Sequence, residues 1–192
     1  MLNGMRNLEQ ELKLSLEERE YDILSALTEQ KPQLQTNYYF CSENFPQNTM
    51  VRIREKGGVY LLCVKRLLQQ NRGVTVCDER ECEVSPNFAR NLLSRGIRSS
   101  ELNGMLKTDF DEDLRCVGKM DTYRTAFCLK EWHLELDKNL YLNKCDYELE
   151  CESANVQQLN ELENYLFYAY GVVIKHSVSK SKRFFEALNG KV

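Results

Sequence analysis

The chain has 192 residues, 42% of them hydrophobic and 29% charged, which is enough apolar material for a packed core and excludes wholesale disorder. At about 150 residues per domain, this length predicts a single domain over residues 1–192. The 26 basic and 29 acidic residues leave a net charge of −3, which disfavours a nonspecific nucleic-acid binder because such proteins carry a basic excess.

Short segments in which apolar and polar residues alternate recur along the chain, and this period of two predicts β-strands. Gly57-Gly58 lies between two of these segments and predicts a two-residue hairpin turn. In chain order the predicted strands are Met5–Leu14, Gln35–Cys41, Met50–Lys56, Val59–Leu67, Val74–Val84, Leu114–Lys119, Thr122–Lys130, Trp132–Leu136 and Asp146–Glu152.

Helices are predicted between the strands from their capping residues. Ser15 with Glu18 forms a capping box for a first helix that runs to about Glu29. Ser85-Pro86 opens a second helix, which Gly96 ends. The other predicted helices are a short one over Ser100–Leu106, one that starts at Ser153, ends at Gly171 and buries Val156, Leu159, Leu162, Leu166 and Ala169, and one over Lys182–Leu188. Antiparallel strands dominate, so we predict an α+β fold, a barrel with accessory helices.

Membrane and zinc-binding classes are disfavoured. The longest apolar run, Val59–Val64, is far shorter than the roughly 18 residues that span a bilayer, and no secretory signal is visible, so we expect a cytoplasmic protein with no membrane partner. The eight cysteines include no Cys-x-x-Cys pair, and we expect them to be reduced thiols. Neither of the two histidines, His133 and His176, lies in a cluster typical of a zinc site, and we expect His133 to serve the structure.

Several predicted strands have one face that is almost entirely charged. Residues alternate between the two faces of a strand, and solvated faces ordinarily mix charge signs and hydroxyl groups. One alternative is an antiparallel sheet with a hydrated charged face. The other is a closed barrel in which the charged faces line the inside, where buried charges must pair or bind ions. Its cavity would gather the acidic residues Glu9, Glu11, Glu81, Glu83, Glu148 and Glu150 and the basic residues Lys13, Arg52, Arg54, Lys65 and Arg124, and would suit a polyanion with Mg²⁺ or Mn²⁺.

The charged motifs occur in an order that resembles a known family. Near the N-terminus, Glu9-Gln10-Glu11-Leu12-Lys13 has the pattern Glu-x-Glu-x-Lys. It is followed by Asn37-Tyr38-Tyr39-Phe40, Val51-Arg52-Ile53-Arg54, Lys65, Glu79-Arg80-Glu81-Cys82-Glu83, Thr122-Tyr123-Arg124, Leu136-Asp137…Tyr141, Asp146-Tyr147-Glu148-Leu149-Glu150 and Lys180-Ser181-Lys182. Over residues 5–188 this combination resembles the CYTH superfamily, the triphosphate tunnel metalloenzymes, and is most similar to its small bacillus-type members. One departure is Cys41, since relatives usually have Asp there.

The resemblance implies a closed, eight-stranded antiparallel tunnel that binds a triphosphate with a divalent metal, Mg²⁺ or Mn²⁺. By motif matching it implies metal-binding carboxylates at Glu9, Glu11, Glu148 and Glu150, with Glu81 and Glu83 as further candidates. It implies phosphate-binding cations at Lys13, Arg52, Arg54, Lys65, Arg124 and Lys180, with Lys182 as a further candidate that could equally be a solvated residue at a helix start. Arg80 is also a further candidate, and the alternative is that it points outward, because it alternates against its glutamate neighbours. The catalytic set would be Glu9, Glu11, Lys13, Glu148 and Glu150.

Three functions stay open from the sequence. The first is a metal-dependent hydrolase of inorganic triphosphate or of a triphosphate-bearing small molecule, which needs positioned charge rather than a covalent nucleophile. The second is a class IV-type adenylate cyclase, and the third is a non-catalytic polyphosphate-binding protein. The absence of a Walker-type Gly-x-x-x-x-Gly-Lys sequence excludes a P-loop nucleotidase. We expect a small-molecule partner, no nucleic acid, and a monomer or homodimer.

Overall fold

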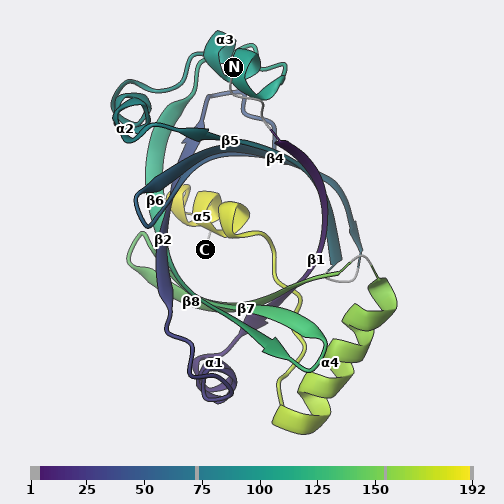
Figure 1. Cartoon of the computed structure of the whole chain (residues 1–192). Coiled ribbons are helices and arrows are strands. Elements are labelled where there is room, and N and C mark those ends of the chain that lie inside the picture. Colours follow the sequence, from purple (N-terminus) through teal and green to yellow (C-terminus); the bar gives the residue numbers. More distant parts are fainter. Residues whose placement is uncertain (1–4, 72–73, 154, 191–192) are drawn as a thin grey trace. The chain divides into compact units, whose positions relative to one another are not determined.

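The computed structural model describes residues 5–71, 74–153 and 155–190, with side chains described from residue 10 onward. In this part of the chain eight strands form a closed barrel in the order β1-β5-β4-β3-β2-β6-β7-β8 (Figure 1). The strands are β1 (Met5–Leu16), β2 (Gln33–Cys41), β3 (Thr49–Lys56), β4 (Val59–Asn71), β5 (Val74–Val84), β6 (Arg115–Leu129), β7 (Trp132–Tyr141) and β8 (Lys144–Glu152). The helices are α1 (Glu18–Ser25), α2 (Pro86–Arg95), α3 (Ser99–Leu106), α4 (Val156–Tyr170) and α5 (Lys180–Leu188). The predicted α+β barrel is confirmed.

The chain divides into two compact units. Unit 1 holds the described residues of 1–8, 35–68 and 77–120, and unit 2 those of 9–34, 69–76 and 121–192. Strands β1, β2, β4, β5 and β6 contribute residues to both units. The single domain expected over residues 1–192 stays a prediction.

Unit 1 is built on the antiparallel strands β2, β3 and β4, with the apolar face of the sheet under two helices. The predicted hairpin turn joins β3 to β4, and Gly57 and Gly58 have φ angles of 59° and 85°, in the region that glycine adopts at low cost. The sheet and helices bury Phe40, Val51, Ile53, Leu62, Val64, Cys82 and Val84 of the strands against Ala89 and Leu92 of α2 and Leu102 and Leu106 of α3. Helix α2 begins as predicted, because the Ser85 hydroxyl accepts a hydrogen bond from the Phe88 N–H and Pro86 follows it.

Unit 2 has the same organisation around β1, β8, β7 and β6, which pair in that order. The apolar face buries Leu12, Leu14 and Leu16 of β1 with Leu134, Leu136 and Leu149 against Leu24 of α1 and Leu159, Leu162 and Leu166 of α4. Figure 1 shows α1 and α4 on one side of β7 and β8 and α5 on the other. The opposite face of these strands, which carries the charged residues, is therefore the face that α5 contacts.

The predicted start of the first helix is wrong. Ser15 belongs to β1, where it pairs with Glu148, and α1 begins at Glu18. The Glu20 carboxylate accepts a hydrogen bond from the Glu17 N–H, so the capping interaction exists two residues later than predicted. Pairing with β8 holds Ser15 extended, and this tertiary contact overrides the local helix signal.

Other boundaries also differ from the sequence prediction. The segments predicted over 114–119 and 122–130 form one long strand, β6, and β7 extends to Tyr141 rather than Leu136. Helix α4 is capped by Asn155, not Ser153, since the Asn155 side chain accepts from the Gln157 N–H. Leu159, Leu162 and Leu166 are buried as predicted, but Val156 and Ala169 are exposed. Helix α5 begins at Lys180 after Ser179, two residues before the predicted start.

No helix in the described part of the chain is long and apolar enough to cross a membrane.

Candidate functional site

Four neighbouring strands of unit 2 place charged residues on one face. Lys13 of β1 lies opposite Glu150 of β8, Asp137 of β7 lies opposite Glu148, and Arg124 of β6 lies opposite Asp137. Because residues opposite one another in antiparallel strands share a face, these side chains are neighbours. The alternation that buries Leu12, Leu14 and Leu149 on the apolar face therefore builds this charged face as well.

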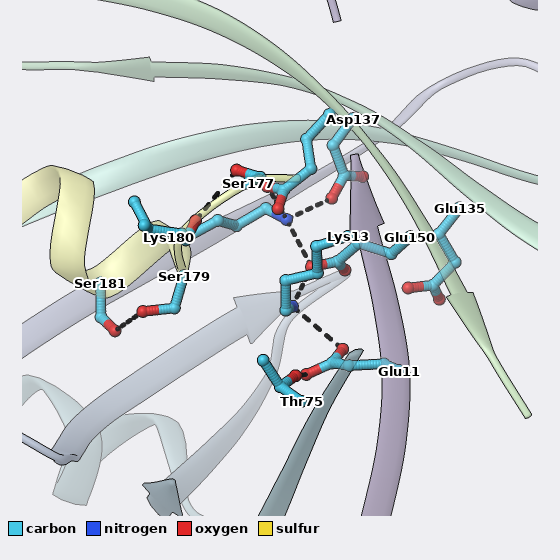
Figure 2. Close-up of polar contacts among 12 residues, drawn as sticks. Glu11, Lys13, Thr75, Glu135, Asp137, Glu150, Ser177, Ser179, Lys180 and Ser181 are labelled. Atoms are coloured by element: carbon cyan, nitrogen blue, oxygen red, sulfur yellow. Dashed lines mark hydrogen bonds and ion pairs between the residues drawn. The ribbon is translucent and has the colours of Figure 1, made fainter. Parts of the chain in front are cut away.

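Helix α5 adds two cations, Lys180 and Arg183. Figure 2 shows Lys180 reaching from α5 toward Asp137. The Lys180 Nζ lies 2.9 Å from Asp137 Oδ2, 2.7 Å from Glu148 Oε2 and 2.9 Å from Glu150 Oε1. Arg183, one helical turn further, donates to Glu148 Oε2 over 2.7 Å and to Asp146 Oδ2 over 3.0 Å. The spacing of three residues puts both side chains on one face of the helix.

Lys13 and Arg124 complete the network from the strands. The Lys13 Nζ lies 3.0 Å from Glu11 Oε2 and also contacts the Glu150 carboxylate. Arg124 forms a bidentate pair with Asp137, with distances of 2.8 and 2.6 Å, and its Nη2 contacts Glu150 Oε2 over 2.5 Å. It also contacts Glu135. Charge-assisted bidentate contacts of this kind are stronger and more directional than single neutral hydrogen bonds.

Burial and charge act against each other in this network. Asp137 and Glu148 have no exposed side-chain surface. Burial by itself would raise the pKa of Glu150, but Lys13, Lys180 and Arg124 together hold that pKa well below its usual range. Burial would likewise raise the pKa of Asp137, and Lys180 and Arg124 lower it overall. For Lys180 burial acts to lower the pKa, and Asp137, Glu148 and Glu150 together raise it above its ordinary value. The groups are thus held in their charged forms.

The network contains more carboxylates than cations. Its charged members are six carboxylates, Glu11, Glu135, Asp137, Asp146, Glu148 and Glu150, and four cations, Lys13, Arg124, Lys180 and Arg183. Glu148 Oε1 is buried with no hydrogen-bond partner among the described residues. Ammonium groups lie between the carboxylates, and within the described part of the chain no group of three acidic, histidine or cysteine side chains is arranged so that it could hold a metal ion. Carboxylate oxygen is the type of donor that Mg²⁺ and Mn²⁺ prefer, but a metal would have to displace the ammonium groups.

A second charged group lies in unit 1. Glu79 of β5 receives Arg52 Nη2 at 3.4 Å on one oxygen and Lys65 Nζ at 3.3 Å on the other. The Cys63 thiol donates to Glu79 Oε1 over 2.9 Å, and burial raises the pKa of this thiol, so it stays protonated. Arg54, on the same face of β3 as Arg52, donates to Asn37 Oδ1 over 3.2 Å. Three predicted phosphate-binding cations thus lie near one another.

The structure brings together most of the predicted site residues, in two sets. Unit 2 gathers Glu11, Lys13, Arg124, Glu148, Glu150 and Lys180, and unit 1 gathers Arg52, Arg54 and Lys65. The side chain of Glu9 lies outside the described residues.

The remaining candidates from the sequence differ in how exposed they are. Glu81 is half-buried, and Glu83 and Lys182 are exposed. Arg80 points away from the glutamates, which is the alternative that its parity left open, because it donates to the carbonyl oxygens of Leu106 and Lys107 at the end of α3. Cys41, in place of the usual Asp, is half-buried at the end of β2.

Sequence reasoning missed several members of these networks. Three acidic residues lie within or next to the charged motifs but were given no role from the sequence: Asp137, Glu135 and Glu79. Each alternates in step with the charged face of its strand. Arg183 was missed because the helix was predicted to start at Lys182, whereas a start at Lys180 puts Arg183 one turn from Lys180. The alternation and the three-residue spacing were the available signals.

Comparison with known proteins gives consistent matches over almost the whole chain. The family model for the CYTH domain matches residues 7–185. The Bacillus subtilis (strain 168) protein named "Putative triphosphatase YjbK" is 29% identical over 188 residues, covering 94% of this chain and 96% of that protein.

Two solved structures share the fold. One is HpAC1 from Hippeastrum, a "putative adenylyl cyclase" that "reveals a dominant" triphosphatase activity, with a TM-score of 0.78, 22% identity and coverage of 93% of this chain and 96% of that one. The other is a "putative adenylate cyclase" from Bacillus halodurans, with a TM-score of 0.75, 23% identity and coverage of 94% and 98%.

Proposed function

The chain belongs to the CYTH domain family, and from this premise we propose that it is a divalent-metal-dependent hydrolase of inorganic triphosphate or of a triphosphate-bearing small molecule. The observation that carries the proposal is the network of unit 2, where buried carboxylates and cations occur together and Glu148 Oε1 is left without a partner among the described residues. A protein that only bound anions would have no use for a buried excess of carboxylates. The name of the Bacillus subtilis relative supports the same reaction class.

The cations provide the phosphate-binding side of the proposed function. Arg52 and Arg54 offer planar guanidinium groups that can hold phosphate oxygens in pairs, while Lys65 adds a point charge. In unit 2, Lys13, Arg124 and Lys180 are kept protonated by the carboxylates around them, because those carboxylates raise the pKa of each cation. These groups are therefore fully charged at neutral pH, as neutralising a polyanion requires.

Glu11, Glu148 and Glu150 would hold the divalent metal, with Glu9 as a further ligand from the same motif. When bound, Mg²⁺ or Mn²⁺ would neutralise phosphate oxygens and polarise a water for attack on phosphorus. The chain's own part is to orient these carboxylates and to keep them ionised. Lys180 contacts two of these carboxylates, Glu148 and Glu150, so its ammonium has to give up contacts as a cation and a triphosphate enter.

The test is a product assay with the purified protein and tripolyphosphate, ATP or thiamine triphosphate, each with Mg²⁺ or Mn²⁺. Release of orthophosphate that requires metal is expected. The Glu150→Gln variant should lose turnover by orders of magnitude, whereas Glu161→Gln, exposed on α4, should keep it.

The assay also separates the alternatives. Pyrophosphate with cyclic AMP would identify an adenylate cyclase, and tight binding without any product would identify a polyphosphate-binding protein. Turnover that is indifferent to metal and to Glu150→Gln would refute the proposal.

A further inference from the structure

Three carboxylates on one face of β8 differ in how many hydrogen bonds they accept. Asp146, Glu148 and Glu150 are spaced two residues apart, so they share that face. A carboxylate has about four acceptor sites, and the number that the protein fills determines how much is left for a ligand. All of the acceptor sites of Asp146 are filled, whereas one oxygen of Glu148 has no hydrogen-bond partner among the described residues.

Asp146 is saturated by the protein. Its Oδ1 accepts from Asn139 Nδ2 over 2.9 Å and from Arg183 Nη2 over 3.3 Å. Its Oδ2 accepts from the Tyr141 hydroxyl over 2.7 Å and from Arg183 Nε over 3.0 Å. Asn139 is fixed in turn, because its Oδ1 accepts from the fully buried Thr122 hydroxyl over 2.8 Å. Asp146 therefore has no acceptor capacity left for a metal or for substrate.

Glu148 is half-saturated. Its Oε2 receives both Arg183 Nη2 and Lys180 Nζ, each at 2.7 Å. Its Oε1 is buried and has no hydrogen-bond partner among the described residues. An unpaired buried oxygen is unfavourable because it has lost its hydration without gaining a hydrogen bond, and a bound cation would remove that cost. The side chain is thus held by one oxygen while the other is left available.

Arg183 connects the two carboxylates. Its Nε and Nη2 contact Asp146, the same Nη2 contacts Glu148, and its Nη1 donates to the Ser177 hydroxyl and the Val178 carbonyl oxygen. Burial acts to lower the pKa of Arg183, but Glu148 and Asp146 raise it overall. The guanidinium is therefore fixed on three sides and cannot follow Glu148 if that side chain rotates.

We infer that Arg183 and Asp146 are positioning residues, which fix the Glu148 carboxylate so that Oε1 faces the metal. Thr122 holds Asn139, Asn139 and Tyr141 hold Asp146, Asp146 holds Arg183, and Arg183 holds Glu148 Oε2. Outer residues that orient a metal-binding carboxylate in this way typically change metal affinity by about 10–100-fold when they are removed. The inference rests on the proposed function, because it requires Glu148 to be a metal ligand.

The experiment compares Mn²⁺ affinity in variants of the outer residues, measured from the free-Mn²⁺ signal in electron paramagnetic resonance. Asp146→Asn keeps the size of the side chain and removes its charge, so Arg183 loses its main anchor and the Mn²⁺ dissociation constant should rise about 10-fold or more. Tyr141→Phe removes one hydroxyl only and should give a smaller rise with the fold intact. Melting temperature is recorded for each variant.

A matched control separates positioning from stability. Leu162→Ala, in the buried apolar face of α4, loosens unit 2 without removing a polar group, so it should lower the melting temperature and leave Mn²⁺ affinity within about 2-fold. Equal Mn²⁺ affinity in wild type, Asp146→Asn and Tyr141→Phe would overturn the inference alone. A wild-type protein that does not bind Mn²⁺ would overturn the proposed metal dependence together with this inference.

Discussion

Loss of the Lys180 cation is predicted to lower the stability of the protein. Its ammonium lies within 2.9 Å of carboxylate oxygens from Asp137, Glu148 and Glu150, and Lys180→Met removes the charge while keeping most of the side-chain volume. Breaking a buried ion pair costs about 3–5 kcal/mol. Each carboxylate keeps another partner, Arg124, Arg183 or Lys13, so we expect the lower end, about 3 kcal/mol.

Urea unfolding at pH 7 measures this loss. For a chain of this size, about 3 kcal/mol corresponds to a fall in melting temperature of roughly 6–12 °C. The control is Lys182→Met, on the same helix but exposed, which should stay within about 0.5 kcal/mol of wild type. A Lys180→Met variant as stable as Lys182→Met would refute the reasoning.

The difference in stability between wild type and Lys180→Met should depend on pH. The pKa values of Glu150 and Asp137 are lowered in the folded protein, so the stability they contribute is present above their unfolded pKa values of about 4 and is lost as the pH falls through the folded values. The difference between wild type and Lys180→Met should therefore narrow below about pH 4. A difference that is the same at pH 3 and pH 7 would contradict the assignment to these carboxylates.

Two further predictions test ligand binding and the backbone. Tripolyphosphate with Mg²⁺ should raise the melting temperature more than chloride or sulfate does at equal ionic strength. At a ligand concentration 100 times the dissociation constant, the free energy of unfolding should rise by about 2.7 kcal/mol. Equal shifts in melting temperature would indicate only a generic basic patch. Gly96→Ala should destabilise the protein, because the φ angle of Gly96 is +89° and a Cβ there would lie 2.4 Å from the Leu114 carbonyl oxygen. Gly104→Ala, in α3 with open space around it, should stabilise the protein by about 0.5–1 kcal/mol in urea titrations. Opposite signs for the two alanines are the expected result, and a neutral Gly96→Ala would contradict the close approach.

The alternation of residues predicted much of the fold and of the site. The parity of Leu12 against Glu11 and Lys13, and of Leu149 against Glu148 and Glu150, correctly assigned each strand an apolar and a charged face. Parity also separated Arg80 from its glutamate neighbours. These are local properties of a strand, so they can be read from short segments.

What the sequence did not predict depends on contacts between distant segments. The capping box at Ser15 is a valid local signal, but strand pairing with Glu148, far along the chain, overrides it. Arg183 has no motif that marks it, and its role is visible only once α5 lies against β8. Which carboxylate oxygen is left without a partner is a matter of side-chain packing, which spacing along the sequence does not encode.

The position of α5 in the chain has a consequence for the order of folding. The carboxylates at Asp137, Glu148 and Glu150 precede α5, and two of the four cations of the network, Lys180 and Arg183, come from that helix. During synthesis, which proceeds from the N-terminus, the strands emerge before the helix that neutralises them. Before α5 binds to the strands, these carboxylates repel one another, which favours a state in which the charged face of the strands is exposed to water. Docking of α5 should thus be a late step, and its release the first step when the native protein begins to open.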